Sequence, residues 1–121
     1  MATFSKQILS GSTNGRGIAV AATATLGTTI HATGTSASIY DEIWLYANNI
    51  HSAAVTLTIE FGGVTTTSDL IQQSIAATPS GLVLVCAGLI LRGTGSAATT
   101  VTAFAGTANK IELFGFVNRI A

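Results

Sequence analysis

The clearest hydrophobic pattern in the chain lies between Ile39 and Gly63, a stretch that also holds the only tryptophan and both tyrosines. Its second half alternates strictly between an apolar phase, at Ala53, Val55, Leu57, Ile59 and Phe61, and a second phase, at Ala54, Thr56, Thr58 and Glu60. Successive side chains of a β-strand point to opposite faces, so this alternation is typical of a half-buried strand. We therefore expect the apolar phase to lie in the core.

The first half of the same stretch can be arranged against the second half in two ways. If residues 48–52 form a tight connection, the halves pair as a hairpin that sets Leu45 opposite Val55, with Asp41 opposite Ile59 as the single misfit. If the connection is a corner, the two strands lie in two facing sheets. Both arrangements bury the same apolar residues.

Further candidate strands follow at regular intervals, separated by clusters of Gly, Ser, Asn and Thr. Together with the two above, they are residues 18–22, 28–32, 39–48, 53–61, 70–76, 82–91, 99–104 and 110–118. Short strands with turn signals at this spacing predict an all-β, single-domain antiparallel β-sandwich of about eight strands, similar to a jelly roll. Residues 69–77 also fit a short helix.

Residues 1–27 differ from the rest, because they are rich in Gly, Ser, Thr and Ala and have little to bury. We expect an extended N-terminal arm with a possible first strand near residue 18, followed by a sandwich domain at residues 28–121. The arm is either mobile or ordered on a neighbouring subunit, where Phe4, Ile8 and Leu9 would supply apolar contacts.

Several expected strands are apolar on both faces. Trp44 and Tyr46 lie in the phase opposite to the core residues of their strand, as do Phe114 and Phe116 near the C-terminus. Residues 82–91 are apolar throughout, with Gly88 as an expected bulge. A two-layer sandwich has only one core, so the second apolar faces predict a binding partner.

The charge content strengthens this prediction. Charged residues make up 8 % of the chain, whereas soluble domains contain about 25 %. Five basic and five acidic residues give a net charge of zero, so no electrostatic repulsion keeps copies apart. We interpret the composition as that of a homo-oligomer in which much of the surface is covered.

The same composition argues against other partners. The five basic residues are dispersed, whereas binding to a nucleic-acid backbone needs a dense positive stripe. The N-terminus does not fit a signal peptide, and the longest apolar run is about half as long as a membrane helix. We expect no direct nucleic-acid or membrane partner, synthesis in the cytoplasm and no secretion. The single Cys86 lies in an apolar run and is expected to be a small buried hydrophobe.

One pair of carboxylates can be compared with known chemistry. In the hairpin register, Glu42 and Glu60 are diagonal neighbours about 7–8 Å apart, which overlaps the separation of paired glycosidase carboxylates. Tyr40 and Trp44 would share that face, and the four residues together would suit a sugar-binding platform. Carboxylates beside aromatics are also ordinary strand surface.

No other constellation points to catalysis. His31 and His51 are the only histidines, and neither has a nearby Cys or a suitably spaced carboxylate for a metal site. Neither a nucleotide-binding loop nor a Gly-x-Ser-x-Gly motif is present. We therefore expect no catalytic, cofactor-binding or metal-binding residues, and no enzymatic activity.

Three stretches carry a resemblance to a known class of proteins. They are Tyr-Asp-Glu-Ile-Trp-Leu-Tyr-Ala-Asn at 40–48, Leu-Thr-Ile-Glu-Phe-Gly-Gly at 57–63 and Asn-Lys-Ile-Glu-Leu-Phe-Gly-Phe-Val-Asn-Arg-Ile at 109–120. They resemble small virion structural proteins of tailed bacteriophages, most of all capsid decoration (cement) proteins with a β-sandwich or jelly-roll core. The resemblance implies homo-oligomers, commonly trimers, that sit on the capsid lattice and reinforce it. It implies no catalytic or ligand residue.

Three hypotheses follow. The first is a non-enzymatic virion protein, made in the host cytoplasm, that binds itself and the major capsid protein or another virion protein and so stabilises the phage head. Its expected contacts are Phe4, Ile8, Leu9, Trp44, Tyr46, Phe114 and Phe116. The second is a carbohydrate-binding or receptor-binding β-sandwich module that uses Tyr40, Glu42, Trp44 and Glu60. The third is a phage tail or connector component.

Overall fold

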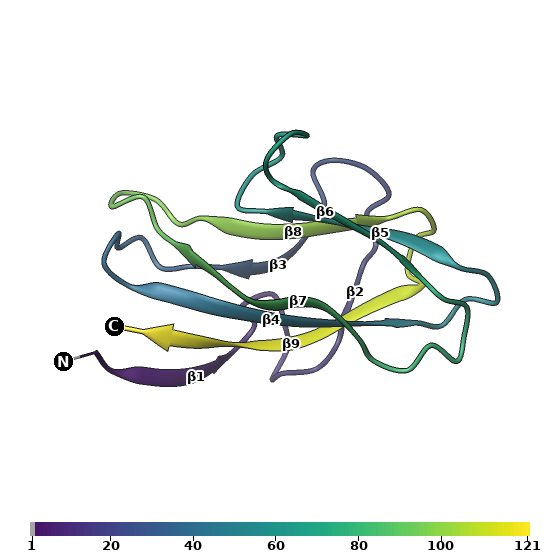
Figure 1. The fold of residues 1–121 in the computed structure, drawn as a ribbon, viewed down its shortest axis with the longest axis horizontal. Coiled ribbons are helices and arrows are strands. Elements are labelled where there is room, and N and C mark those ends of the chain that lie inside the picture. The colour runs from purple at the N-terminus through teal and green to yellow at the C-terminus, as the bar shows by residue number, and fades with distance from the viewer. Residues whose placement is uncertain (1) are drawn as a thin grey trace.

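A computed structural model describes residues 2–121 as nine β-strands (Figure 1). The strands are β1 (Phe4–Ile8), β2 (Ile18–Ala19), β3 (Thr28–Ala32), β4 (Tyr40–Asn49), β5 (Val55–Phe61), β6 (Leu70–Ile75), β7 (Val83–Arg92), β8 (Thr100–Ala105) and β9 (Ile111–Ile120). This part of the chain contains no helix, and hence none that could cross a membrane. All eight strands expected from the pattern are present, and the segment that also fitted a helix is β6.

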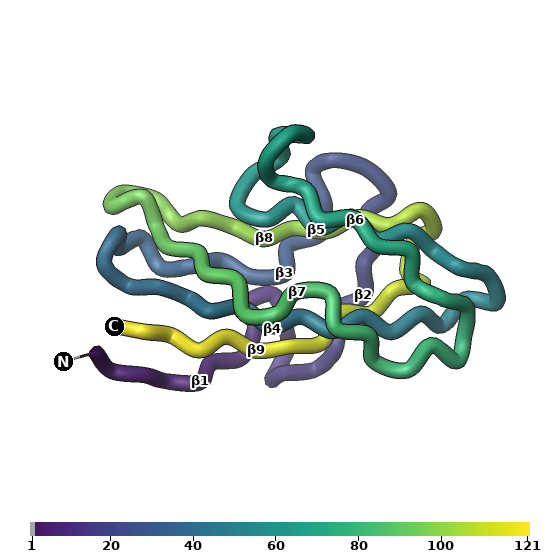
Figure 2. Tube along the Cα trace, in the orientation of Figure 1, coloured from purple at the N-terminus to yellow at the C-terminus, as the bar shows by residue number. Residues whose placement is uncertain are grey.

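The strands form two antiparallel sheets packed face to face (Figures 1 and 2). Sheet A has the order β1-β9-β4-β7, with β2 pairing to another part of β9, and sheet B has the order β3-β8-β5-β6. Thr3 and Ala121 lie at the same end of the sandwich, where they exchange backbone hydrogen bonds of 2.7 and 2.9 Å. The predicted antiparallel β-sandwich is confirmed.

The pairing is that of one long antiparallel hairpin that has been rolled up. In the unrolled hairpin β2 pairs with β9, β3 with β8, β4 with β7 and β5 with β6. Rolling adds two contacts that close the sheets, β9 with β4 and β8 with β5. This is the topology of a jelly roll, in which consecutive strands mostly alternate between the two sheets.

Of the two arrangements that the sequence left open for β4 and β5, the hairpin is wrong and the corner is right. Both edges of β4 are occupied, by β7 and β9, so β5 crosses to sheet B. Asn49 holds the corner, because its Nδ2 donates to the carbonyl oxygens of Ala53, Ile75 and Ala76 at 3.0–3.1 Å and its Oδ1 accepts from the His51 amide at 2.8 Å. The apolar phases of both strands still meet in the core, as expected.

The N-terminal segment lies on the chain's own sandwich. Strand β1 pairs with β9, with Phe4 opposite Ile120 and Ile8 opposite Phe116, and all five β1 side chains are exposed. The residues after β1 are buried differently, since Leu9 and Val20 are 1 % and 0 % exposed and belong to the core. The first 27 residues therefore include both an exposed edge strand and part of the interior.

The expected bulge at Gly88 is confirmed. Ile43 pairs with Leu89 and Trp44 with Ala87, so Gly88 is skipped in the register between β4 and β7, and its φ is 73°. A positive φ is accessible to glycine at little cost. A second irregularity in the register follows between Cys86 and Leu84.

Candidate functional site

The face of sheet A that points away from sheet B is the main candidate for function. Along β4, every second residue is buried against sheet B, and the intervening ones, Tyr40, Glu42, Trp44 and Tyr46, point outward. Paired residues share a face in a sheet, so the register extends this surface over β9 and β7. We call it the outer face of sheet A, and its central members are Tyr40, Glu42, Trp44, Tyr46, Phe114, Phe116, Leu84, Ala87 and Ile90.

An aromatic pair lies at the middle of this face. The rings of Trp44 and Phe116 stack with centroids 6.2 Å apart and planes at 11°. The Lys6 ammonium lies 4.7 Å from the Phe116 ring centroid, a cation–π contact from β1. A Cβ at Gly88 would lie 2.9 Å from Trp44 Cζ2, so the absence of a side chain at this position makes room for the indole.

Glu42 is tied to the same cluster. Trp44 Nε1 donates to Glu42 Oε1 at 2.8 Å, and Asn118 Nδ2 donates to the same oxygen at 3.0 Å. The indole hydrogen bond, followed by that of Asn118, lowers the pKa of the Glu42 carboxyl, because both stabilise its charged form. The indole is thereby fixed in place, with its polar edge satisfied from within the chain.

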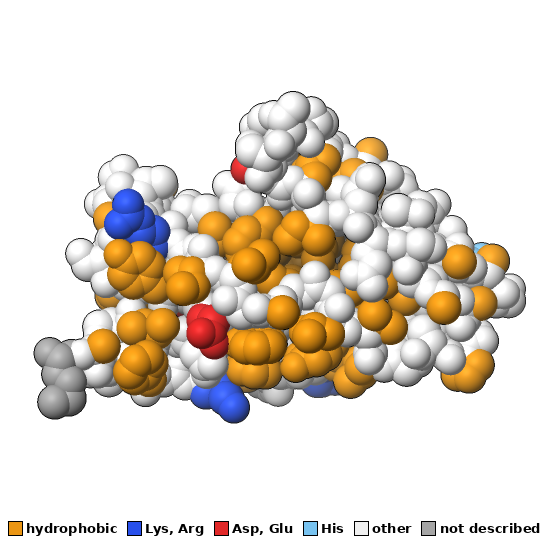
Figure 3. All heavy atoms as spheres, in the orientation of Figure 1, with side chains coloured by type: hydrophobic (Ala, Val, Ile, Leu, Met, Phe, Trp, Pro, Cys, Tyr) orange, Lys and Arg blue, Asp and Glu red, His pale blue; other side chains and the backbone are white. Residues whose placement is uncertain are grey.

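The rest of the face is largely apolar and open to solvent. Leu84 and Ile90 on β7 are 45 % and 54 % exposed, and Phe4 and Ile8 on β1 are 70 % and 53 % exposed. The space-filling view shows hydrophobic side chains gathered where β7, β4 and β9 lie, with only a few charged ones between them (Figure 3). Exposed apolar side chains gathered on one face are typical of interaction sites in general.

The structure brings together six of the seven residues expected at an interface. Trp44 lies beside Phe116 and Tyr46 beside Phe114, in adjacent rows of β4 and β9, while Phe4 and Ile8 extend the same face onto β1. The seventh, Leu9, is instead in the core at 1 % exposure, so it presents no surface to a partner.

The four residues proposed for a sugar platform do not come together. Tyr40, Glu42 and Trp44 share the outer face of sheet A, but Glu60 is on β5 in sheet B. The diagonal pair of Glu42 and Glu60 depended on the hairpin register, which is wrong, so the paired-carboxylate site does not exist.

Glu60 is instead a buried structural carboxylate, 1 % exposed. Its Oε1 accepts from the Gly27 amide at 2.7 Å and from Thr102 Oγ1 at 2.6 Å, and its Oε2 accepts from Thr25 Oγ1 at 2.8 Å. Burial acts to raise the pKa of Glu60, but these three hydrogen bonds outweigh burial and leave the pKa below its ordinary value. The carboxylate therefore fastens the loop between β2 and β3 over sheet B.

A second buried polar cluster, which the sequence did not predict, lies around Asp41. Arg119 Nε and Nη2 donate to the two carboxylate oxygens of Asp41 at 2.8 and 3.0 Å, and His31 Nε2 lies 2.7 Å from Oδ2. The Ser10 amide donates to His31 Nδ1 at 3.0 Å, so Nδ1 is an acceptor and the ring carries its proton on Nε2, directed at Asp41. The one available signal was the misfit of Asp41 in the buried phase of β4.

The residue types Ser10, His31 and Asp41 match those of a hydrolytic triad, but the geometry does not. The His31 nitrogen that would accept the hydroxyl proton is occupied by the Ser10 backbone amide, and the Ser10 hydroxyl accepts from the Ala32 amide at 2.7 Å. The ring is also 1 % exposed. Burial acts to raise the pKa of Asp41, but Arg119 and His31 outweigh burial and lower it. The cluster is built to pin β3, β4 and β9 together.

The remaining candidate side chains show no reactive arrangement. Among residues 2–121 no group of three or more His, Cys, Asp or Glu is placed to hold a metal ion. Cys86 is buried, its thiol donates to the Ile43 carbonyl oxygen at 3.3 Å, and burial raises its thiol pKa.

Comparison of the chain with models of known protein families, with curated protein sequences and with solved structures gives no match. The fold and the outer face of sheet A therefore carry the functional argument, together with the strand resemblance described above.

Proposed function

We propose that this protein is a non-enzymatic structural component that assembles with copies of itself through the outer face of sheet A. The observation that carries this proposal is that Trp44, Phe116, Tyr46 and Phe114 lie side by side on the face of sheet A that sheet B does not cover, where each of them is only half-buried. A sandwich needs only one apolar core, and this chain has that core between its sheets. The second apolar face lowers its free energy when another molecule covers it.

The resemblance of the β4, β5 and β9 sequences to phage decoration proteins suggests the assembly in which this happens. A decoration protein binds the assembled lattice and not its separated subunits, so its binding free energy stabilises the lattice by linkage. We propose that the chain acts in this way on a phage head, located in the virion as a homo-oligomer, with trimers as the expected form. A tail or connector component would use the same physics, and labelling of virions with an antibody against the protein distinguishes heads from tails.

The mass of the full chain in solution, measured by light scattering over a range of concentrations, tests the proposal. A discrete oligomer is expected. A protein that stays monomeric at every concentration would contradict the assembly proposal, because the outer face of sheet A would then remain exposed to solvent instead of being covered by another copy.

A carbohydrate-binding role is the second candidate, because Tyr40, Glu42 and Trp44 do lie on one face. Aromatic faces stack on sugar rings and carboxylates accept hydroxyl hydrogen bonds. Trp44 is the only tryptophan, so its fluorescence reports this site alone. Strong acrylamide quenching in the assembled protein, together with a fluorescence change on adding oligosaccharides, would favour this role. A shielded indole would favour assembly.

A further inference from the structure

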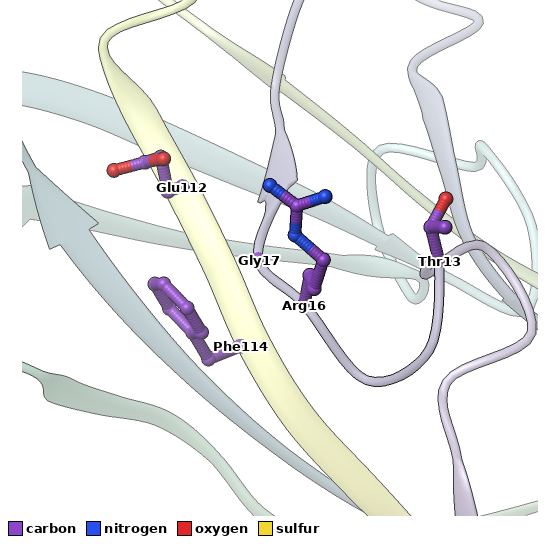
Figure 4. Close-up of a pocket in the computed structure, with 5 residues that line it drawn as sticks. All are labelled: Thr13, Arg16, Gly17, Glu112 and Phe114. Atoms are coloured by element: carbon purple, nitrogen blue, oxygen red, sulfur yellow. The ribbon is translucent and has the colours of Figure 1, made fainter.

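A hollow lies at one end of the outer face of sheet A, where the loop between β1 and β2 lies beside β9. Its volume is about 460 Å³, and it is lined by Thr13, Arg16, Gly17, Glu112 and Phe114 (Figure 4). A Cβ at Gly17 would lie 2.6 Å from Phe114 Cζ, so the loop packs directly on the ring. The Ser12 hydroxyl donates to the Arg16 carbonyl oxygen at 2.9 Å and braces the loop. The position of Arg16 relative to β9 is therefore set by the fold.

Arg16 and Glu112 lack ionic partners within the described chain. Every ion pair among residues 2–121 involves Asp41, so neither of these two charges is in one. The Glu112 carboxylate accepts one long hydrogen bond, 3.5 Å from Asn48 Nδ2. A partner that covers this part of the face would bury both charges, at a cost unless it presents one charge of each sign in return.

A second copy of the chain meets this requirement when the two copies are related by a two-fold axis at the hollow. In a two-fold contact the same patch meets itself, so residue i of one copy contacts residue j of the other and j contacts i. Arg16 and Glu112 line one hollow, and a two-fold axis that passes between them, perpendicular to the line that joins them, sets each Arg16 against the Glu112 of the other copy. The chain has no net charge that would oppose the approach.

We propose that two copies dock through the outer face of sheet A, with reciprocal Arg16–Glu112 ion pairs at the hollow fixing the orientation. The inference rests on the proposed function, since it names the contact through which self-assembly begins. It adds a two-fold contact to the assembly, whereas the trimers implied by the resemblance need a contact between two different patches.

Charge exchange tests the contact. Four samples are compared: Arg16→Glu alone, Glu112→Arg alone, a one-to-one mixture of the two, and the double variant. Sedimentation velocity at low salt measures the dissociation constant of self-association for each sample. Each single variant sets like charges opposite each other twice per contact, so we expect weakening of about tenfold or more. In the mixture, the hollow of the first variant carries two negative charges and that of the second carries two positive charges. Both contacts then join opposite charges, so association should recover, as it should in the double variant.

Lys110→Glu serves as the matched control, because it makes the same change in net charge as Arg16→Glu, two residues from Glu112 but outside the hollow. It should associate like the wild type. This contact would be overturned if both single variants associated as well as the wild type, or if mixing them did not restore association. The hollow would then be left to another partner or a small zwitterion, while self-assembly itself would stand. A wild-type chain that is monomeric throughout would overturn the assembly proposal and this contact with it.

Discussion

Trp44 and Phe116 stack on the outer face of sheet A, from neighbouring strands, with ring planes only 11° apart. The pair is outside the core between the sheets, so its contribution to folding should be smaller than its contribution to association. Tryptophan at the centre of an interface is a common hot spot, worth about 2 kcal/mol or more on truncation.

We therefore expect Trp44→Ala to weaken self-association by about thirtyfold or more while lowering Tm only slightly. Light scattering and a thermal melt measure the two effects on the same sample. Thr56→Ala is the control, because Thr56 is exposed on sheet B. If Trp44→Ala instead left assembly unchanged and lowered Tm strongly, the indole would belong to the folding core.

Gly88 offers a test of how the aromatic pair is accommodated. Its φ is 73°, and an added Cβ would lie 2.9 Å from Trp44 Cζ2. We expect Gly88→Ala to lower the free energy of unfolding by about 1–2 kcal/mol, from backbone strain together with displacement of the indole. Gly106→Ala should be close to neutral in urea unfolding, because a Cβ there meets nothing within 4 Å and its φ is not positive. Equal effects at the two positions would contradict this explanation.

The strands other than β1, and the outer face of sheet A, could be predicted from the sequence because both depend on a local period of two. Ile43, Leu45, Val55 and Leu57 fall in the buried phase whichever strands lie beside them. The pairing of β4 could not be predicted in the same way, since a hairpin and a corner bury the same side chains. Only the final neighbours, β7 and β9, decide between them.

The features that could not be predicted from the sequence depend on backbone hydrogen bonds, on loops that cover side chains of a sheet, and on contacts between residues far apart in the chain. Strand β1 is held by hydrogen bonds to β9, and all five of its side chains are exposed. Its sequence therefore lacks the alternation of buried and exposed residues by which the other strands were predicted. Glu60 lies in the polar phase of β5 and would be solvated but for the loop that ends at Gly27. Asp41 gave a visible misfit, but its partners Arg119 and His31 are far away in the sequence.

Glu60 allows a comparison of two substitutions at one buried carboxylate. In Glu60→Gln, one amide oxygen can still accept from the Gly27 amide and Thr102, and Thr25 can turn its hydroxyl to accept from the new NH₂ group. The loss of stability should be about 1 kcal/mol. Glu60→Ala leaves those donors without an acceptor and should cost about 3 kcal/mol. Urea unfolding measures both, and faster hydrogen exchange at Gly27 in Glu60→Ala alone would locate the effect. Similar losses in the two variants would argue against the hydrogen-bonding explanation.

The buried carboxylates also set the response to acid. The folded pKa values of Asp41 and Glu60 lie below their ordinary values. Each carboxylate therefore adds stability above the unfolded-state pKa of about 4, and this stability is lost as the pH falls through the folded pKa. We expect the free energy of unfolding to fall steeply below about pH 4.

The variant Asp41→Asn separates the contribution of Asp41. At neutral pH it should be less stable by about 2 kcal/mol or more, because Arg119 and His31 lose a charged partner. Its loss of stability on acidification should be smaller than that of the wild type. Urea unfolding at a series of pH values measures both effects, and an unchanged acid dependence would show that Asp41 titrates alike in the folded and unfolded chain.

Ile8 and Leu9 are adjacent in sequence but belong to different parts of the molecule, at 53 % and 1 % exposure. Leu9→Ala should lower the free energy of unfolding by about 3 kcal/mol, because it leaves a cavity in the core. Ile8→Ala should change the free energy of unfolding little and should weaken association if β1 contributes to the covered face.

Deleting residues 1–8 should likewise leave a folded sandwich, because it removes only exposed side chains of the described segment. Deleting residues 1–27 also removes Leu9, Ile18 and Val20 from the core and the Gly27 amide from Glu60, so this shorter chain should fail to fold. Circular dichroism with thermal melting distinguishes the two deletions. A cooperative melt from the chain lacking residues 1–27 would show that the interior closes without its N-terminal part and that this segment is an accessory arm after all.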